Sequence, residues 1–103
     1  MAPPAGFVPR NKVRGDDQSR ATEDARRLAR LLVSEIKLYN EKKVEEGRKH
    51  LDLYHRLKDD IDRSRQVFEE RTPEAIRKGN DFFHEELVRI LADGRSEALG
   101  HVG

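Results

Sequence analysis

Residues 23–68 read EDARRLARLLVSEIKLYNEKKVEEGRKHLDLYHRLKDDIDRSRQVF and form one charged run without proline. Apolar residues recur in its first half at steps of three or four: Ala25, Leu28, Leu32, Ile36 and Tyr39. Three further residues widen this stripe, namely Ala29, Leu31 and Leu38. The spacing is typical of an amphipathic helix that buries a broad face. Because the run covers almost half of the chain, we expect an all-α fold.

The second half of the run carries another helical series. Its members alternate steps of four and three and are His50, Tyr54, Leu57, Ile61, Ser64 and Phe68. Such steps form a two-heptad seam with polar interruptions. Oppositely charged residues stand four apart along the same segment, and each such pair stabilises a helix by about 0.2–0.5 kcal/mol. The segment is therefore predicted to be a solvated helix with one apolar edge.

The architecture depends on whether the run bends. Asn40 and Gly47 are the positions where we expect a bend, since no proline occurs between Pro9 and Pro73. An unbroken helix would be roughly 75–80 Å long, and it would need a partner along its length to bury its stripe. A turn near residues 40–47 would instead give a helical hairpin. The sequence thus predicts either a hairpin or a coiled-coil-like bundle.

A further helix is predicted after Pro73. Thr72 can cap it, proline suits the first helical position, and Glu74 favours the positive end of the helix dipole. Residues 79–81 could split this segment, so that the helix restarts at Phe82. Asp93 and Gly94 indicate its end.

The remaining segments flank one helical domain, which we assign to residues 18–94. Residues 1–17 hold three prolines and two glycines, a composition that disfavours a helix and predicts a disordered or partner-docking tail. In the docking interpretation, Phe7 and Val8 fill a partner's pocket while Arg10 pairs with acidic groups around it. Residues 95–103 are expected to be a short C-terminal tail.

The composition favours an exposed helical protein over an enzyme. The chain has 103 residues, of which 35% are hydrophobic and 40% are charged, with a net charge of +1. This length allows one domain at most. Dense charge of mixed sign with helical periodicity is typical of a long exposed helix or coiled coil.

The sequence contains no targeting signal that we recognise. It has no cysteine, which excludes disulfides and thiol chemistry. Residues 1–15 lack the apolar core of a signal peptide, and no stretch approaches the ~18–20 apolar residues of a membrane span. We expect a cytoplasmic protein without a membrane partner.

Two Asp-x-x-His spacings, Asp52 with His55 and Asp81 with His84, raise a metal-binding helical bundle as one alternative. Di-iron bundles place glutamates and Glu-x-x-His pairs on facing helices. Here the acid is aspartate, no Glu-x-x-His occurs, and no recognisable nucleophile accompanies the histidines. The sequence therefore predicts no enzyme, no catalytic residue, no metal ligand and no cofactor.

Nucleic-acid binding is the other alternative. The basic tail continues into four arginines that could contact phosphates, which are Arg20, Arg26, Arg27 and Arg30. Acidic residues at positions 16, 17, 23 and 24 interrupt this surface. A helical protein that binds nucleic acid through its tail and first helix is thus the first alternative.

The segments RRLARLLVSEIKLYNEKKVEEG (26–47) and DLYHRLKDDIDRSRQ (52–66) resemble helical segments of uncharacterised bacterial proteins. The resemblance covers about half of the chain and implies a bacterial source. It implies no activity.

The function that we predict is non-catalytic: a helical oligomerisation or scaffold module, or a small accessory subunit of a larger bacterial assembly. Its partner would be a second copy or another protein. The apolar residues expected to pack within one chain or between chains are Leu28, Leu32, Ile36, Tyr39, Tyr54, Leu57, Ile61, Phe68, Ile76, Phe83, Leu87 and Ile90.

Overall fold

The computed structural model describes residues 10–100, with side chains described from Ser19 onward. Every regular element in this range is a helix, which confirms the all-α prediction. The elements are α1 (Arg10–Tyr39), α2 (Glu41–His50), α3 (Leu53–Arg56), α4 (Lys58–Arg71), α5 (Glu74–Gly79), α6 (Phe82–Glu86), the π-helical segment η1 (Leu87–Leu91) and the 3₁₀ turn η2 (Ser96–Leu99).

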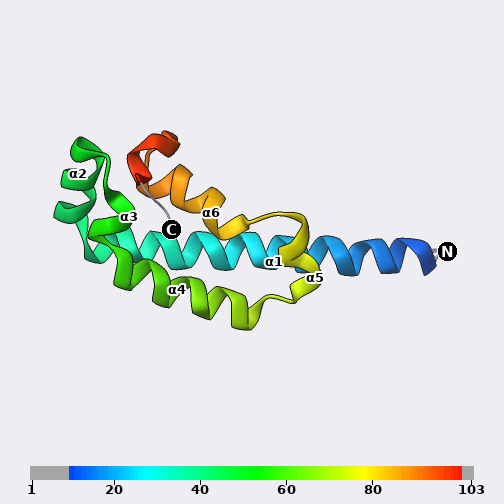
Figure 1. Ribbon diagram of the computed structural model, residues 1–103. Coiled ribbons are helices and arrows are strands. Elements are labelled where there is room, and N and C mark those ends of the chain that lie inside the picture. The colour runs from blue at the N-terminus through cyan, green and yellow to red at the C-terminus, as the bar shows by residue number, and fades with distance from the viewer. Residues whose placement is uncertain (1–9, 101–103) are drawn as a thin grey trace.

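α1 is the long central helix on which the other elements pack. At about 1.5 Å per residue its 30 residues span roughly 45 Å, and the molecule measures 59 × 22 × 21 Å. In Figure 1, α4 runs back along one side of α1, while α6 lies along the other side. The first turns of α1, drawn in blue, extend beyond α5. The shape is therefore an elongated helical bundle around a single long helix.

The core lies where α1 meets α4, α6 and η1. α1 contributes a stripe of mostly small residues, and the elements packed on it contribute large ones. The rings of Phe68 and Phe83 lie 5.8 Å apart between centroids, at a tilt of 40°. The buried members from α1 and α2 are Ala25, Ala29, Val33, Ile36 and Val44. Those from later elements include Leu53, Leu57, Ile61, Phe68, Phe82, Phe83, Leu87, Leu91, Ala98 and Leu99.

The chain turns at Asn40, the first of the two predicted bends. The Asn40 amide donates to the Ile36 carbonyl oxygen at 2.8 Å and to a carboxylate oxygen of Asp60 at 3.0 Å. The Asn40 side chain thus satisfies a carbonyl oxygen at the end of α1 and links α1 to α4. The unbroken helix from residue 19 to 71 is excluded.

Gly47 is not a bend, and the second break comes at Leu51. Gly47 is buried inside α2, where an added Cβ would lie 2.6 Å from Cδ2 of Leu53. Leu51 has φ = +58°, a left-handed conformation that ends α2. The predicted seam from His50 to Phe68 is therefore divided among the end of α2, α3 and α4.

The helix after Pro73 is split at the residues where the sequence allowed a break, and Arg48 fixes the end of η1. The helix after Pro73 comprises only Glu74–Gly79 before the chain breaks at Asn80 and restarts at Phe82. Arg48 of α2 donates to the carbonyl oxygens of Leu91 at 2.7 Å and Ile90 at 3.0 Å, and so holds the end of η1.

The flanking segments also differ from the sequence prediction. The expectation that residues 1–17 form no helix is wrong for residues 10–17, since α1 begins at Arg10. Extending an existing helix requires only propagation, and Gly15 costs about 1 kcal/mol relative to alanine. Ala98 and Leu99, expected in a tail, are buried where η2 packs against α2, α3 and η1.

Candidate functional site

The surface of α1 that faces away from the core carries large apolar side chains. Leu31 is 56% exposed and Leu38 is 62% exposed, although both are bulky enough for a core. Residues seven apart on a helix differ by only about 20° in direction, so the two leucines share one side. Tyr39, 78% exposed, follows Leu38 at the end of α1, about 100° further round the helix. We call Leu31 and Leu38 the outer face, with Tyr39 at its edge.

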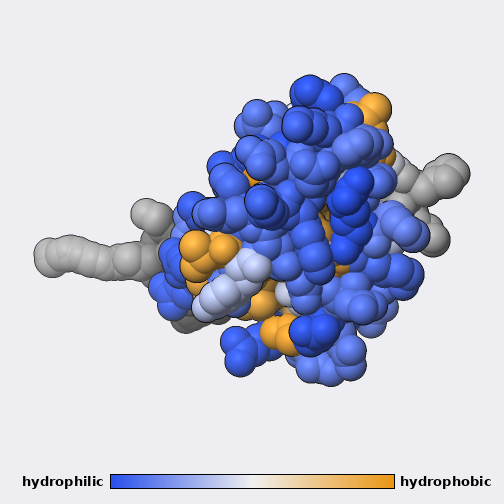
Figure 2. All heavy atoms as spheres, turned by 90° about the vertical axis from the view of Figure 1, so that its left-hand side faces the viewer, coloured by the Kyte–Doolittle hydropathy of each residue, from blue (hydrophilic) through white to orange (hydrophobic). Residues whose placement is uncertain are grey.

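The rest of the surface offers little apolar area of this kind. Among residues 19–100, the only other large hydrophobic side chain with comparable exposure is Leu51, at the turn after α2. Figure 2, which looks along the long axis at the α2 end, shows a mostly hydrophilic surface with apolar atoms in small separate groups. The outer face therefore stands out as a local concentration on one helix.

The charges around Leu31 are only partly paired within the chain. Arg27 lies 3.4 Å from Asp24, one turn earlier on α1. Arg30 and Glu35, both exposed, form no ion pair with any residue in the described part of the chain. One free cation and one free carboxylate thus flank the exposed leucine.

The prediction that Leu31 and Leu38 belong to the buried stripe is wrong. The apolar residues that α1 buries are Ala25, Ala29, Val33 and Ile36. Helical geometry places these on the side opposite Leu31. The signal for the outer face was the seven-residue step between the two leucines, out of phase with the small residues.

Most of the residues predicted to pack between or within chains do so within one chain. Fully buried are Ile36, Leu57, Ile61, Phe68, Phe83 and Leu87. Half-buried at the margin of the core are Leu28, Leu32, Tyr54, Ile76 and Ile90. Only Tyr39 is exposed. The chain thus uses its predicted stripe and seam as its own core.

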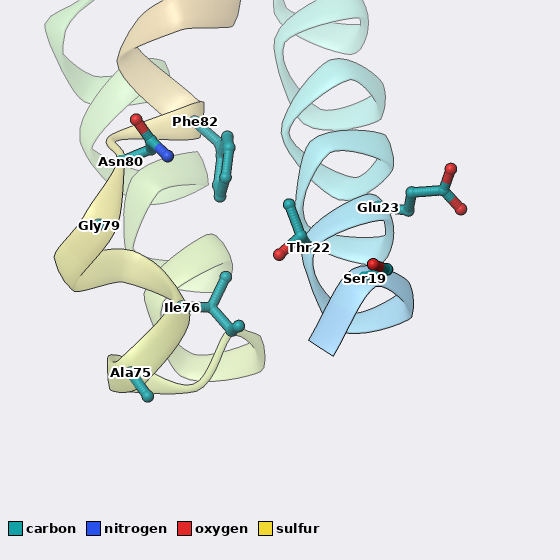
Figure 3. A pocket seen from close by; sticks show the side chains of 8 residues that line it. All are labelled: Ser19, Thr22, Glu23, Ala75, Ile76, Gly79, Asn80 and Phe82. Carbon is teal, nitrogen blue, oxygen red and sulfur yellow. The ribbon is translucent and has the colours of Figure 1, made fainter. Parts of the chain in front are cut away.

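A second surface feature is an open cleft between the N-terminal half of α1 and α5, shown in Figure 3. Its volume is about 710 Å³, and its walls are Ser19, Thr22, Glu23, Ala75, Ile76, Gly79, Asn80 and Phe82. Glu23 is the only ionisable residue among them. Since general acid–base and nucleophilic catalysis need paired groups, this lining does not assemble a catalytic site.

The arginines considered for nucleic-acid binding do not form one free surface. Arg26 stacks on Phe82, with its guanidinium carbon 4.6 Å from the ring centroid, and lies 3.8 Å from Glu85. Arg27 is paired with Asp24, while Arg20 and Arg30 are exposed. Cation–π contact and ion pairing hold Arg26 against α6, which leaves it less free for phosphate.

The two Asp-x-x-His spacings serve local structure. The Asp52 carboxylate accepts from Arg56 at 2.7 Å, and the Asp81 carboxylate accepts from the His84 backbone N–H at 3.1 Å, which caps α6. Within the described range, no three His, Asp or Glu side chains gather as a metal site would require. The docking residues Phe7 and Val8 lie outside this range, as does the side chain of Arg10, the first residue of α1.

One polar cluster links α3 to α4. The Tyr54 hydroxyl donates to one oxygen of Asp62 at 2.8 Å, and Lys58 donates to the other at 2.6 Å. These bonds, that from Lys58 first, lower the pKa of Asp62 below its usual value of 3.8. The bond to Asp62, with some burial, raises the pKa of Tyr54 above 10.0. The cluster stabilises the α3–α4 junction and does not activate either group for chemistry.

No family model, curated protein or solved structure matches this chain. Of the helices in the described part, none combines the length and apolar character needed to cross a bilayer. The assignment of function therefore depends on the surfaces described above.

Proposed function

We propose that this protein is a non-catalytic helical interaction module that associates through the outer face of α1. In this proposal it serves as an oligomerisation or scaffold element, or as an accessory subunit of a larger bacterial assembly, in the cytoplasm. The observation that carries the proposal is the exposure of Leu31, Leu38 and Tyr39 together on one helix.

Burial explains why this surface favours association. A single exposed leucine is ordinary on a protein surface, whereas several large apolar side chains exposed on one helix favour contact with a partner. Transfer of one leucine side chain out of water contributes about 1.5–3 kcal/mol when complete. The chain already has a core without these residues, so their apolar character serves no packing purpose within one copy.

The rigid position of the surface supports the same function. The outer face lies on the longest helix, which α4, α6 and η1 support from behind. An interaction surface on such an element needs little ordering when a partner binds, which lowers the entropic cost of association. By contrast, the cleft between α1 and α5 offers one carboxylate and no group with which it could react.

Site-specific photo-crosslinking tests the proposal. A benzophenone amino acid would replace Leu31 or Leu38 in cells that produce the protein, with the exposed Glu70 on α4 as the control position. We expect a discrete adduct of higher mass from positions 31 and 38 and none from position 70. Absence of adducts at 31 and 38, or equal labelling at all three, would contradict the proposal.

A further inference from the structure

From the pattern of exposed residues, we infer that the partner of the outer face is a second copy of this chain, with the two α1 helices parallel and in register. The inference rests on the proposed function and adds the identity and orientation of the partner. It is drawn from Leu31, Leu38, Arg30 and Glu35 and from the burial of the residues between them.

The exposed residues of α1 occupy the positions that a two-stranded coiled coil uses. With Leu31 and Leu38 at the first position of the heptad, a, the fourth position, d, holds Arg27 and Ser34. Arg30 then occupies g and Glu35 occupies e, the two positions that flank the seam. All six of these side chains are exposed.

In the central heptad, positions b, c and f are the ones that the chain buries in itself. Positions b, c and f of the central heptad are Leu32, Val33 and Ile36, of which the first is half-buried and the others fully buried. In an isolated coiled coil these positions face solvent. α1 therefore has two separate sides, one used by α4, α6 and η1 and one that exposes leucines at two a positions and polar residues at d.

Charge selects the parallel orientation. In a parallel pair, residue g contacts residue e of the following heptad on the partner, so Arg30 of each copy meets Glu35 of the other. This arrangement pairs Arg30 with Glu35, neither of which has an ion pair within the described residues. It also stacks Leu31 on Leu31 and Leu38 on Leu38.

An antiparallel pair would lack both the contacts between leucines and the Arg30–Glu35 ion pairs. There, a packs against d, which places Leu31 opposite Ser34 and Leu38 opposite Arg27. Flanking g positions meet each other, so Arg30 would face Lys37, a like-charge pair. The same face therefore supports a parallel pair through the leucine contacts and two Arg30–Glu35 pairs, at the expense of an Arg27–Arg27 contact at d, and an antiparallel pair through neither.

The seam is short, which sets the strength of the contact. The preceding a position is Asp24, and α1 ends at Tyr39, so apolar contact extends only from Leu31 to Leu38, about two helical turns. An interface of this extent falls in the small class of transient contacts. We expect a concentration-dependent dimer that becomes permanent only where the copies are held close together.

Cysteine trapping tests orientation directly, because the chain contains no cysteine of its own. The variants are Leu31→Cys and Ser34→Cys, with Glu70→Cys on α4 as an exposed control. For the parallel pair, each of the first two forms disulfide-linked dimers by itself under mild oxidation, at least about tenfold faster than the control. Linkage that appears only when the two variants are mixed would show an antiparallel pair and overturn the inference.

Charge reversal tests the Arg30–Glu35 contact. Arg30→Glu and Glu35→Arg each place like charges opposite one another twice in a symmetric dimer, so each should weaken self-association about tenfold by sedimentation. A mixture of the two variants restores both attractive pairs and should associate as tightly as the native chain. Equal weakening of the mixture would contradict the parallel register.

These outcomes separate the inference from the proposed function. If the native chain stays monomeric at millimolar concentration while photo-crosslinks from Leu31 reach a different protein, the inference fails and the proposed function stands. If no crosslinks form at positions 31 and 38, both fail.

Discussion

The two sides of α1 use apolar residues of different size. The buried side carries Ala25, Ala29 and Val33, while the exposed side carries Leu31 and Leu38. Small residues let α4, α6 and η1 approach α1 closely, and those elements supply the bulk of the core with Phe68, Phe83 and Leu87. The difference teaches that the size of an apolar residue on a helix does not identify its buried side. Close packing against several neighbours selects small residues, whereas contact with a separate helix suits leucine.

The same charge introduced on the two sides of α1 should have very different effects on folding. Val33→Asp places a carboxylate in a fully buried position without a partner, so we expect a loss of about 4 kcal/mol or more and no cooperative unfolding transition. Circular dichroism during thermal unfolding measures it. Leu31→Asp is the matched control and should change folding stability by no more than about 0.5 kcal/mol, although it should abolish self-association. Similar destabilisation by both substitutions would refute the assignment of sides.

An exchange of residue size between the two sides of α1 should have smaller effects. Ala29→Leu adds three carbon atoms where α1 is completely buried, and overpacking of this kind destabilises by about 1–3 kcal/mol. Leu31→Ala removes the same atoms from the exposed side and should leave the free energy of unfolding nearly unchanged. Urea denaturation of both variants at low protein concentration provides the measurement. If Ala29→Leu were stabilising, the buried side would contain unfilled space.

The sequence predicted the all-α class and most of the core because the steps of three and four are visible without knowledge of neighbours. It could not tell which of two apolar sides of α1 the chain itself would cover, since that depends on where α4 and α6 lie. The turn at Leu51 had no signal either, because a left-handed residue is normally glycine or asparagine. Ala98 and Leu99 were too few to predict a packed element, and only contact with α2 and α3 buries them.

A pair of glycines extends the comparison to sites without side chains. Gly47→Ala improves helix propensity by about 1 kcal/mol, but the new Cβ would lie 2.6 Å from Leu53 Cδ2 and 3.0 Å from its Cα. Because a backbone atom is among the contacts, we expect net destabilisation of about 1 kcal/mol. Gly79→Ala, at the exposed end of α5 with no atom within 4 Å of the added Cβ, should stabilise by up to about 1 kcal/mol. Thermal unfolding distinguishes them, and a stabilising Gly47→Ala would show that α2 and α3 can separate.

The smallest expected effect concerns the polar cluster at the α3–α4 junction, which is partly exposed and therefore screened by solvent. Since the pKa of Asp62 is lowered, its contribution is fully present above pH 3.8 and is lost as pH falls through the lower folded value. Since the pKa of Tyr54 is raised, its contribution is fully present below pH 10.0 and is lost as pH rises through the higher folded value. Tyr54→Phe should therefore cost less than about 1 kcal/mol at neutral pH and flatten the alkaline side of the stability profile. Asp62→Asn should flatten the acid side. Urea midpoints measured from pH 2 to pH 11 test both predictions. If both variants keep the pH dependence of the native chain, the buried contacts of Leu53 and Leu57 alone hold the junction.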